Sequence, residues 1–594
     1  MAALFTTPKR NDTTAGTHVA EPDVRRRIGL AHGSWRRVTR RIVAGAVCAL
    51  TVSSLLMPSV SLAAEWVKVG GNKYNTAASD EAGTWSWDGA DDLKLNNYNG
   101  GEIQAAGKLN VNYSGTNIVT AEWIESINVS HGTNENAELN IQGNEGGTLS
   151  VTSTEDAILS TGNINIDGAG SVNATSTGFD AINAGGDLAI KGSGNVNATG
   201  ASDGIRANGN ITIDDSGAVT ARATEDKGIG TDKNLTIKGG GTVEASSADG
   251  EALWSGGNIN ISDGSQVKAS SEKDAAVEAK GSLAATNASL NVNGVKYGVY
   301  AYKGITLDHA NVTVRAGKGR YGGAIALFTY PGDIVVKNGS TVDAFAEGEV
   351  SAAFSTRSDR PNEEGGHIYI SDSVVKAIAR YVENGDGPIP YSENQDGETS
   401  PEPQGENIGI IAQTSEGVTP AVVSIIRSKV TAEGDTAAIF ARAMSADGKT
   451  IGTIKIENAA IQTPEGGKVI DYRKLRDGIY EAGQAIGTGD AVIDSPYNEA
   501  VAKSMVIAPP EVAKPEDPMP DETKPAESKP AESKQNPKPE GSKPTKAVAA
   551  SITKAKTTGV LAATGDTSGA AIVAAALAGT AAIAAGAVVS RKHS

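Results

Sequence analysis

Three columns of apolar residues recur at nearly constant spacing through the middle of this 594-residue chain. The spacing within each column is 23 or 24 residues, and the three columns keep step with one another. A unit this short cannot bury a core alone, so each repeat must stack on the next and the chain must grow along one axis. The columns are Ile164, Leu188, Ile211, Leu235, Ile259 and Leu283; Val172, Val196, Val219, Val243 and Val267; and Ile158, Ile182, Ile205, Ile229, Leu253 and Val277.

Short alternating runs such as Asn163-Ile164-Asn165-Ile166 predict strands with one apolar face. Gly, Asn and Asp separate these runs too closely for a helix to intervene, so each repeat holds about three strands and three turns. We therefore expect an all-β fold, a single-stranded right-handed parallel β-helix. Residues 64–115 would form the N-terminal cap and first coils, and residues 116–506 the remaining solenoid. The low aromatic content of 4% suits a narrow interior.

Two outer columns support stacking in register. Asn163, Asn210, Asn234 and Asn258, with Asp187 in the same position once, recur before the first strand, where side-chain amides can bond along the axis. After that strand the sign of the charge alternates between repeats, which predicts ion pairs between neighbouring coils. These charged residues are Asp167, Lys191, Asp214 and Lys238.

Residues 1–63 are typical of an export signal. Basic residues precede an apolar run over residues 42–57, and small residues then predict cleavage between Ala63 and Ala64. A transmembrane anchor is the alternative reading, and the sequence leaves open the Sec or Tat route. The single cysteine, Cys48, lies inside the apolar run, so the exported chain would have no disulfide. The net charge of −17 disfavours nucleic acid as a partner.

The C-terminal end, residues 561–594, resembles a sortase sorting signal. It contains Leu561-Ala562-Ala563-Thr564-Gly565, an apolar run over residues 569–589 long enough for a membrane helix, and a basic tail. The resemblance implies cleavage between Thr564 and Gly565 by a sortase, attachment to peptidoglycan and display on a Gram-positive cell wall. Ala562 replaces the commoner proline, which leaves the sortase class open, and an ordinary membrane anchor is the alternative. The Pro-rich residues 507–560 predict a disordered stalk.

Residues 65–506 resemble secreted β-helix proteins described as carbohydrate-binding and related in fold to pectate lyases. The resemblance rests on Trp87-Asp88-Gly89, on Asn97-Tyr98-Asn99-Gly100-Gly101, and on coils such as Gly257-Asn258-Ile259-Asn260-Ile261. It implies the fold more strongly than it implies any ligand.

The third strand of each repeat has the most varied outer face. Arg206, Trp254, Tyr300 and Phe440 follow its buried column, and aromatic rings beside a guanidinium suit a sugar, whose C–H groups stack on rings. These residues are therefore the candidate ligand-binding set. The alternative is that they are isolated surface aromatics or are buried where the coils distort.

Asp156, Asp180 and Asp203 recur near that face, one in each repeat. Stacked carboxylates repel one another unless a cation or a proton lies between them, so a Ca²⁺ site is one prediction. The alternative is that they are turn formers that bond to backbone.

The predicted function is that of a cell-wall-anchored adhesin that binds an extracellular polysaccharide or host glycan through the solenoid face. A structural or protein-binding spacer is one alternative, and a polysaccharide lyase is another. We expect a protein that is not an enzyme, because His131, His309 and His367 have no metal-ligand spacing and the sequence contains no recognisable catalytic motif.

Overall fold

The structure is a computed structural model, and every described residue belongs to one compact unit, Met1–Val512. All of the regular elements among the described residues are strands. The described residues are 63–121, 127–130, 137–214, 217–317, 323–358, 365–382, 407–415, 418–444, 452–470, 491–493 and 501–510.

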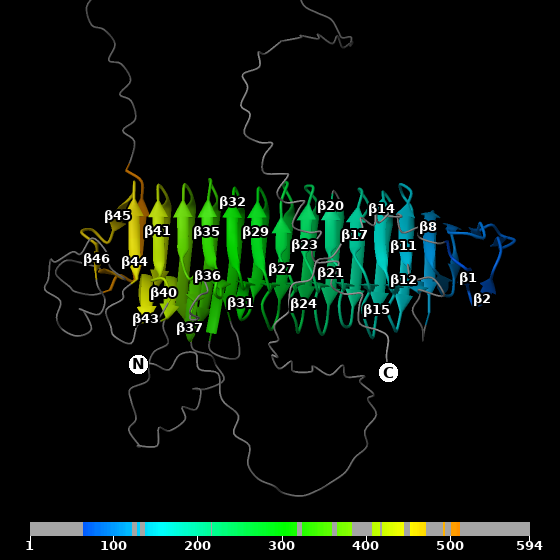
Figure 1. The fold of residues 1–594 in the computed structure, drawn as a ribbon, viewed down its shortest axis with the longest axis horizontal. Helices are drawn as coiled ribbons and strands as arrows, with labels where there is room; N and C mark the ends of the chain where they lie inside the picture. The colour runs from blue at the N-terminus through cyan, green and yellow to red at the C-terminus, as the bar shows by residue number, and fades with distance from the viewer. Residues whose placement is uncertain are drawn as a thin grey trace, which may run out of the picture. The chain divides into compact units, whose positions relative to one another are not determined.

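The strands form three long sheets, here called sheets A, B and C, and each coil contributes one strand to each sheet (Figure 1). Sheet A consists, in spatial order, of β3 (Ala78–Ser79), β4 (Trp85–Trp87), β5 (Asp92–Asn96), β8 (Lys108–Ser114), β11 (Glu138–Gly143), β14 (Asn163–Gly168), β17 (Leu188–Lys191), β20 (Ile211–Asp214), β23 (Leu235–Lys238), β26 (Ile259–Ile261), β29 (Ser282–Thr286), β32 (Gly304–Asp308), β35 (Asp333–Lys337), β38 (Ile368–Ser371), β41 (Val422–Ile426) and β44 (Thr453–Glu457).

Sheet B carries the third strand of each coil. Its members, in order of pairing, are β2 (Asn72–Tyr74), β1 (Trp66–Val69), β7 (Ile103–Ala106), β10 (Ile127–Ser130), β13 (Ile158–Ser160), β16 (Ile182–Ala184), β19 (Ile205–Ala207), β22 (Ile229–Thr231), β25 (Leu253–Ser255), β28 (Val277–Ala279), β31 (Tyr297–Ala301), β34 (Gly323–Thr329), β37 (Val350–Ser358), β40 (Asn407–Ser415), β43 (Ala437–Met444), β47 (Ala491–Ile493) and β46 (Lys468–Ile470).

Sheet C completes the coil. It consists, in order, of β6 (Asn99–Gly100), β9 (Thr116–Thr120), β12 (Thr148–Ser153), β15 (Ser171–Ser176), β18 (Val196–Gly200), β21 (Ala218–Ala223), β24 (Thr242–Ser247), β27 (Gln266–Ser271), β30 (Ser289–Gly294), β33 (Asn311–Gly317), β36 (Thr341–Gly348), β39 (Val374–Tyr381), β42 (Lys429–Gly434), β48 (Ser504–Ala508) and β45 (Ala460–Thr463).

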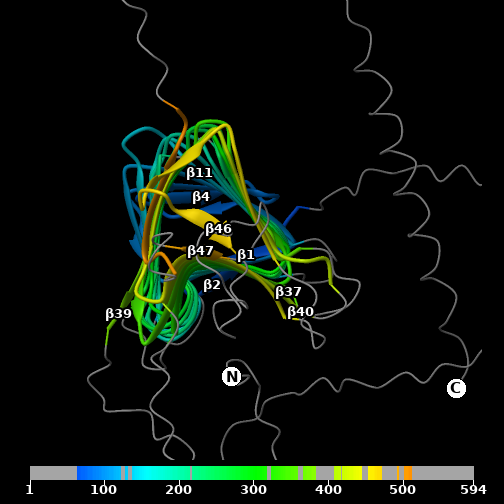
Figure 2. The same cartoon turned by 90° about the vertical axis from the view of Figure 1, so that its left-hand side faces the viewer.

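The three predicted apolar columns are confirmed, and each one stacks in register along its own sheet. Ile164 pairs with Leu188 in sheet A, Val172 with Val196 in sheet C, and Ile158 with Ile182 in sheet B. The side chains are almost fully buried and belong to one continuous core. Seen along the solenoid axis, successive coils superimpose around this narrow interior (Figure 2). The fold is thus a parallel β-solenoid, and its right-handed winding stays a prediction based on the usual hand of parallel crossovers.

Both ends of the solenoid depart from the parallel pattern. At the N-terminal end β1 pairs antiparallel with β2 and β7, and the buried Trp85 and Trp87 lie on an antiparallel strand of sheet A. At the C-terminal end β48 pairs antiparallel with both β42 and β45. β48 ends at Ala508, two residues inside the segment predicted as a stalk. Antiparallel strands therefore end two of the three sheets at each end of the solenoid, whereas β6 of sheet C and β44 of sheet A pair parallel.

The amide column runs along the start of sheet A as predicted. The side-chain oxygens of Asn163, Asp187, Asn210, Asn234 and Asn258 each accept the backbone N–H that lies one coil further on, at 2.6–3.3 Å. Each amide therefore fixes the register of the next coil.

Of the predicted charge ladder, Lys238 pairs with Asp214 at 2.8 Å. This pair joins β20 to β23 on the outer face of sheet A.

The two predicted processing sites are only partly covered by the described residues. Ala63 forms a single bridge with Lys108, and Ala64 is buried in the core. Residues 1–62 and the predicted sorting motif, Leu561, Ala562, Ala563, Thr564 and Gly565, lie outside the described residues. Within the described part, no helix has the length and apolar character needed to cross a membrane.

Candidate functional site

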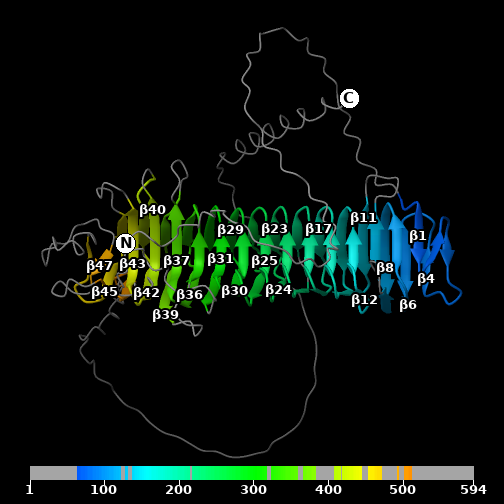
Figure 3. The same cartoon turned by 90° about the horizontal axis from the view of Figure 1, so that it is seen from below.

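The outer face of sheet B carries a column of side chains that changes character from coil to coil. The column follows from strand alternation, because the residues on either side of each member point into the core. It contains three of the four predicted ligand-binding residues in a single register, along strands that succeed one another on the solenoid (Figure 3). In order, its central members are Arg206, Gly230, Trp254, Glu278, Tyr300 and Phe328.

Trp254 is half-buried on β25, between two cations and two glycines. The guanidinium carbon of Arg206 lies 5.9 Å from the centroid of the indole ring, and Nζ of Lys227 lies 5.4 Å from it. Gly230 precedes Trp254 in the column and Gly256 follows it in the chain, and the side chain of Lys227 lies over Gly230. The ring is held by cation–π contacts with both cations.

Four aromatic residues gather beyond Trp254 on β31 and β34 and in the turn after β31. The ring of Tyr300 lies 4.6 Å from that of Tyr302, 5.1 Å from that of Tyr297 and 5.0 Å from that of Phe328, between centroids. Tyr297 also stacks on Phe328 at 5.3 Å with an interplanar angle of 10°. Because the ring faces cover one another, the cluster offers mainly ring edges and phenol groups. Burial raises the pKa of both Tyr297 and Tyr300, so these phenols stay protonated as donors.

Charged groups on this face are arranged in pairs. Nη2 of Arg206 lies 2.6 Å from Oδ1 of Asp232. Lys227 pairs with Asp226. These pairs keep both cations beside Trp254 without leaving them uncompensated.

A third pair links the two aromatic parts of the face. Lys280 pairs with Glu278, and its Nζ lies 4.6 Å from the ring centroid of Tyr302. Glu278 is nine-tenths buried between Trp254 and Tyr300 in the column. The pair thus places a carboxylate and an ammonium group between the indole and the tyrosines.

Phe440 does not join this face, contrary to the expectation of an accessible ring. It lies in the same register on β43, but its residue is only 2% exposed. It belongs to a second apolar cluster with Ala352, Ile408, Ile411 and Ala437, against which Ile325 and Val501 also pack. In β37, β40 and β43 both faces of sheet B are buried, so a sugar has no access to the Phe440 ring in this conformation.

The acidic column has a structural role in these coils. Oδ1 of Asp156 accepts the N–H of Asp180, Oδ1 of Asp180 accepts the N–H of Asp203, and Oδ1 of Asp203 accepts the N–H of Lys227, at 2.6–2.9 Å. Each carboxylate bonds to the next coil rather than to its own turn. The column continues with Glu251, whose pKa is raised by burial. Burial also raises the pKa of Asp180, and it raises that of Asp203 to about 7.

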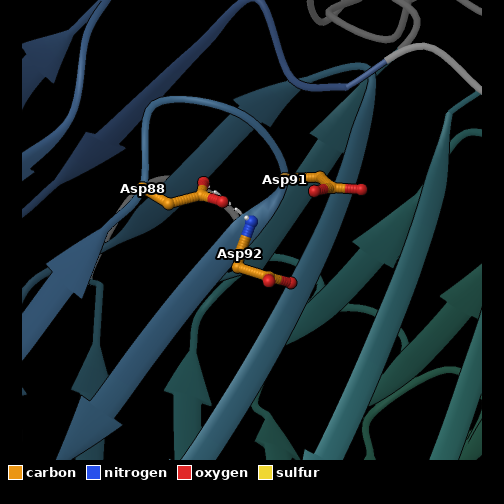
Figure 4. A group of neighbouring side chains, drawn as sticks. All are labelled: Asp88, Asp91 and Asp92. Carbon is orange, nitrogen blue, oxygen red and sulfur yellow. Dashed lines mark hydrogen bonds between the residues drawn. The ribbon is translucent and has the colours of Figure 1, made fainter.

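The predicted calcium ligands do not converge. Asp156, Asp180 and Asp203 do not bring their ligand oxygens within 4.8 Å of one another, whereas Asp88, Asp91 and Asp92 do so, alone among the described residues (Figure 4). Oδ1 of Asp88 accepts the N–H of Asp92 at 3.1 Å and the N–H of Ala90 at 2.8 Å. These bonds give the cluster a turn-forming role near the N-terminal end.

A groove of about 550 Å³ lies on the outer face of sheet A. The floor of the groove is formed by small residues in one register of sheet A. In this register Asn165 is followed by the smaller Ala189, Thr212 and Thr236. The amide column borders the groove, and no aromatic side chain lines it. It therefore lacks the ring that the face of sheet B provides.

Sequence reasoning missed Tyr297, Tyr302, Phe328 and the Glu278–Lys280 pair. Tyr302 and Lys280 lie one residue beyond the third strand of their coils. Asp232 holds the same position in an earlier coil, so an alignment of the coils would have identified this position. Phe328 was missed because its coil is longer, so that it does not follow Tyr300 at the 24-residue spacing of the repeat.

Comparison with known proteins gave no match: no family model, no curated protein and no solved structure resembles the chain sufficiently. The resemblance to carbohydrate-binding β-helix proteins therefore stays a prediction.

Proposed function

We propose that the chain is a glycan-binding adhesin that uses the outer face of sheet B. The observation that supports this most is the gathering of Trp254, Tyr300 and Phe328 in one register beside paired charges. An indole face attracts the C–H groups of a pyranose ring, and carboxylates, ammonium groups and phenols bond to sugar hydroxyls. The face combines both kinds of group within a few coils.

The ligand would bind on an open strip rather than in a deep pocket. Trp254 is half-buried on the outer face of β25, and Gly256, two residues further along the chain, adds no side chain beside it. An open strip admits the middle of a long polysaccharide as readily as its end, which suits attachment to a surface polymer.

We further propose that the protein is displayed on a Gram-positive cell wall. The support is the sequence of the two ends: the export signal before Ala64, and the Leu561–Gly565 motif with its apolar run and basic tail. The partners would be a sortase and peptidoglycan. Deletion of Leu561–Gly565 should move the protein from the wall fraction to the medium or the membrane. Retention in the wall fraction would contradict this proposal.

A rigid spacer without a sugar ligand is a second candidate. The regular amide column favours it, because side chains that lock coil to coil make a stiff rod whatever the faces bind.

A glycan array probed with the full-length chain tests the proposal. Binding should weaken about tenfold in Trp254→Ala, since the indole supplies the stacking face. Tyr369→Ala is the matched control, because Tyr369 is an exposed aromatic residue on the outer face of sheet A. Absence of binding to every glycan would favour the spacer, whereas equal binding by both variants would contradict a binding site on the face of sheet B.

A further inference from the structure

The contacts on the face of sheet B are spread along the solenoid axis. Trp254 and Tyr300 are two coils apart in one register, with Glu278 between them. Neighbouring strands lie about 4.8 Å apart, so the two side chains start about 10 Å apart along the axis. A residue in an extended β-1,4-linked polysaccharide advances by nearly the distance of one coil, whereas chains that coil into helices advance less. The column therefore matches an extended chain that lies along it.

Two glycines lie beside the indole for different reasons. Gly230 lies between Arg206 and Trp254 in the column, and the side chain of Lys227 covers it. At Gly256 a Cβ would lie 2.4 Å from the carbonyl oxygen of Asp232, so the packing of one coil on the next requires glycine at this position. At Gly230 a Cβ would lie 2.8 Å from Cδ of Lys227. This side chain is flexible, so the packing of the coils does not by itself require glycine at this position.

The charges on this face decide which sugars fit. The three cations that contact the rings of Trp254 and Tyr302 are Arg206, Lys227 and Lys280, and each already has a carboxylate partner. A uronate would have to displace one carboxylate and lie among the others, at a cost in like-charge repulsion. A neutral sugar instead supplies hydroxyl donors to these carboxylates.

We infer that the face of sheet B selects a neutral, extended polysaccharide whose chain runs parallel to the solenoid axis, with one sugar stacked on Trp254 and a later one against Tyr300. The inference rests on the proposed function and specifies its ligand. Because Trp254 and Tyr300 are two coils apart, a ligand must span about three sugar residues to reach both.

Calorimetric titration of the full-length chain tests this inference with four probes. They are cello-oligosaccharides and manno-oligosaccharides of two to six residues, maltohexaose, and hexagalacturonate. We expect at least one of the two extended neutral series to bind, with affinity that rises about tenfold between two and four residues. We expect maltohexaose and hexagalacturonate to bind at least tenfold more weakly than the best hexasaccharide.

Two variants locate the ligand. Tyr300→Ala should abolish the rise in affinity with length while leaving the disaccharide affinity within about twofold, and Tyr369→Ala should change neither. Far-UV circular dichroism at each step checks that the solenoid is intact.

The outcomes separate the two proposals. Preferred binding of hexagalacturonate or maltohexaose through Trp254 would overturn the inference and leave glycan binding in place. An affinity independent of chain length would overturn the axial arrangement. No binding to any saccharide, here and on the array, would overturn both proposals.

Discussion

Replacing Asp203 with Asn tests whether the buried acid of this face destabilises the solenoid when it is charged. Burial, with smaller contributions from Asp180 and Asp226, raises the pKa of Asp203 from 3.8 to about 7. Its residue is only 4% exposed. Asn keeps an oxygen to accept the N–H of Lys227, which Oδ1 of Asp203 accepts at 2.6 Å. The substitution therefore removes the charge and preserves the contact between coils.

The direction in which stability changes with pH follows from the pKa of Asp203 in the unfolded and in the folded chain. Below about pH 4 Asp203 is protonated in both states, and its ionisation does not affect stability. As the pH rises the unfolded chain loses the proton first, so the free energy of unfolding falls until the folded protein also ionises near pH 7. A difference of about three pKa units corresponds to roughly 4 kcal/mol. Relative to the wild type, Asp203→Asn should gain up to roughly this amount between pH 4 and pH 8.

Urea unfolding followed by circular dichroism, at unit steps from pH 4 to pH 8, measures the difference. Asp187→Asn is the matched control, because Oδ1 of Asp187 also accepts an N–H of the next coil, at 2.6 Å, but Asp187 is exposed and water already solvates its charge. Its difference from the wild type should stay flat. If the Asp203→Asn difference also stayed within about 1 kcal/mol across this range, the burial argument would be refuted.

Three further substitutions test the stacking of the coils, each by urea unfolding. Leu235→Ala removes a fully buried member of the sheet A column and should cost about 2–5 kcal/mol, well above the cost of Leu159→Ala on the outer face of sheet B. Gly256→Ala places a methyl group against a backbone carbonyl and should cost about 1–3 kcal/mol, whereas Gly323→Ala, with its nearest atom at 3.8 Å, should cost less. Asn234→Ala removes an acceptor of a backbone N–H and should cost about 1 kcal/mol, and Asn234→Asp, which keeps an oxygen, should cost less.

The repeated coils were predictable because stacking imposes the same demand at every turn. Ile211, Leu235 and Ile259 lie in the same register and the same buried environment, so the same type of residue recurs at the same spacing in every coil. The ends were less predictable. A terminal coil has a neighbour on one side only, and the antiparallel pairing of β48 joins segments whose relation no repeat spacing records.

The candidate site was predicted in part, and Phe440 shows why. Strand alternation correctly gave its register on sheet B, but register does not say whether a further layer covers the face. The residues that cover it, among them Val501, lie far away in the sequence. The acidic column illustrates the opposite case. The spacing of Asp156, Asp180 and Asp203 was correct, but whether stacked carboxylates take a cation or an N–H depends on side-chain direction, which spacing does not contain.

Departures from the repeat point to the functional face more clearly than the repeat itself. Stacking favours like residues on neighbouring coils, and the interior columns and the amide column follow that rule. The column from Arg206 to Phe328 changes residue type at every coil, although each position has the same strand geometry. Stability of the solenoid does not require an indole, a buried carboxylate and a phenol in succession there. A ligand that meets each coil with a different group would require such a series, so the irregular column is the part of the surface best explained by recognition.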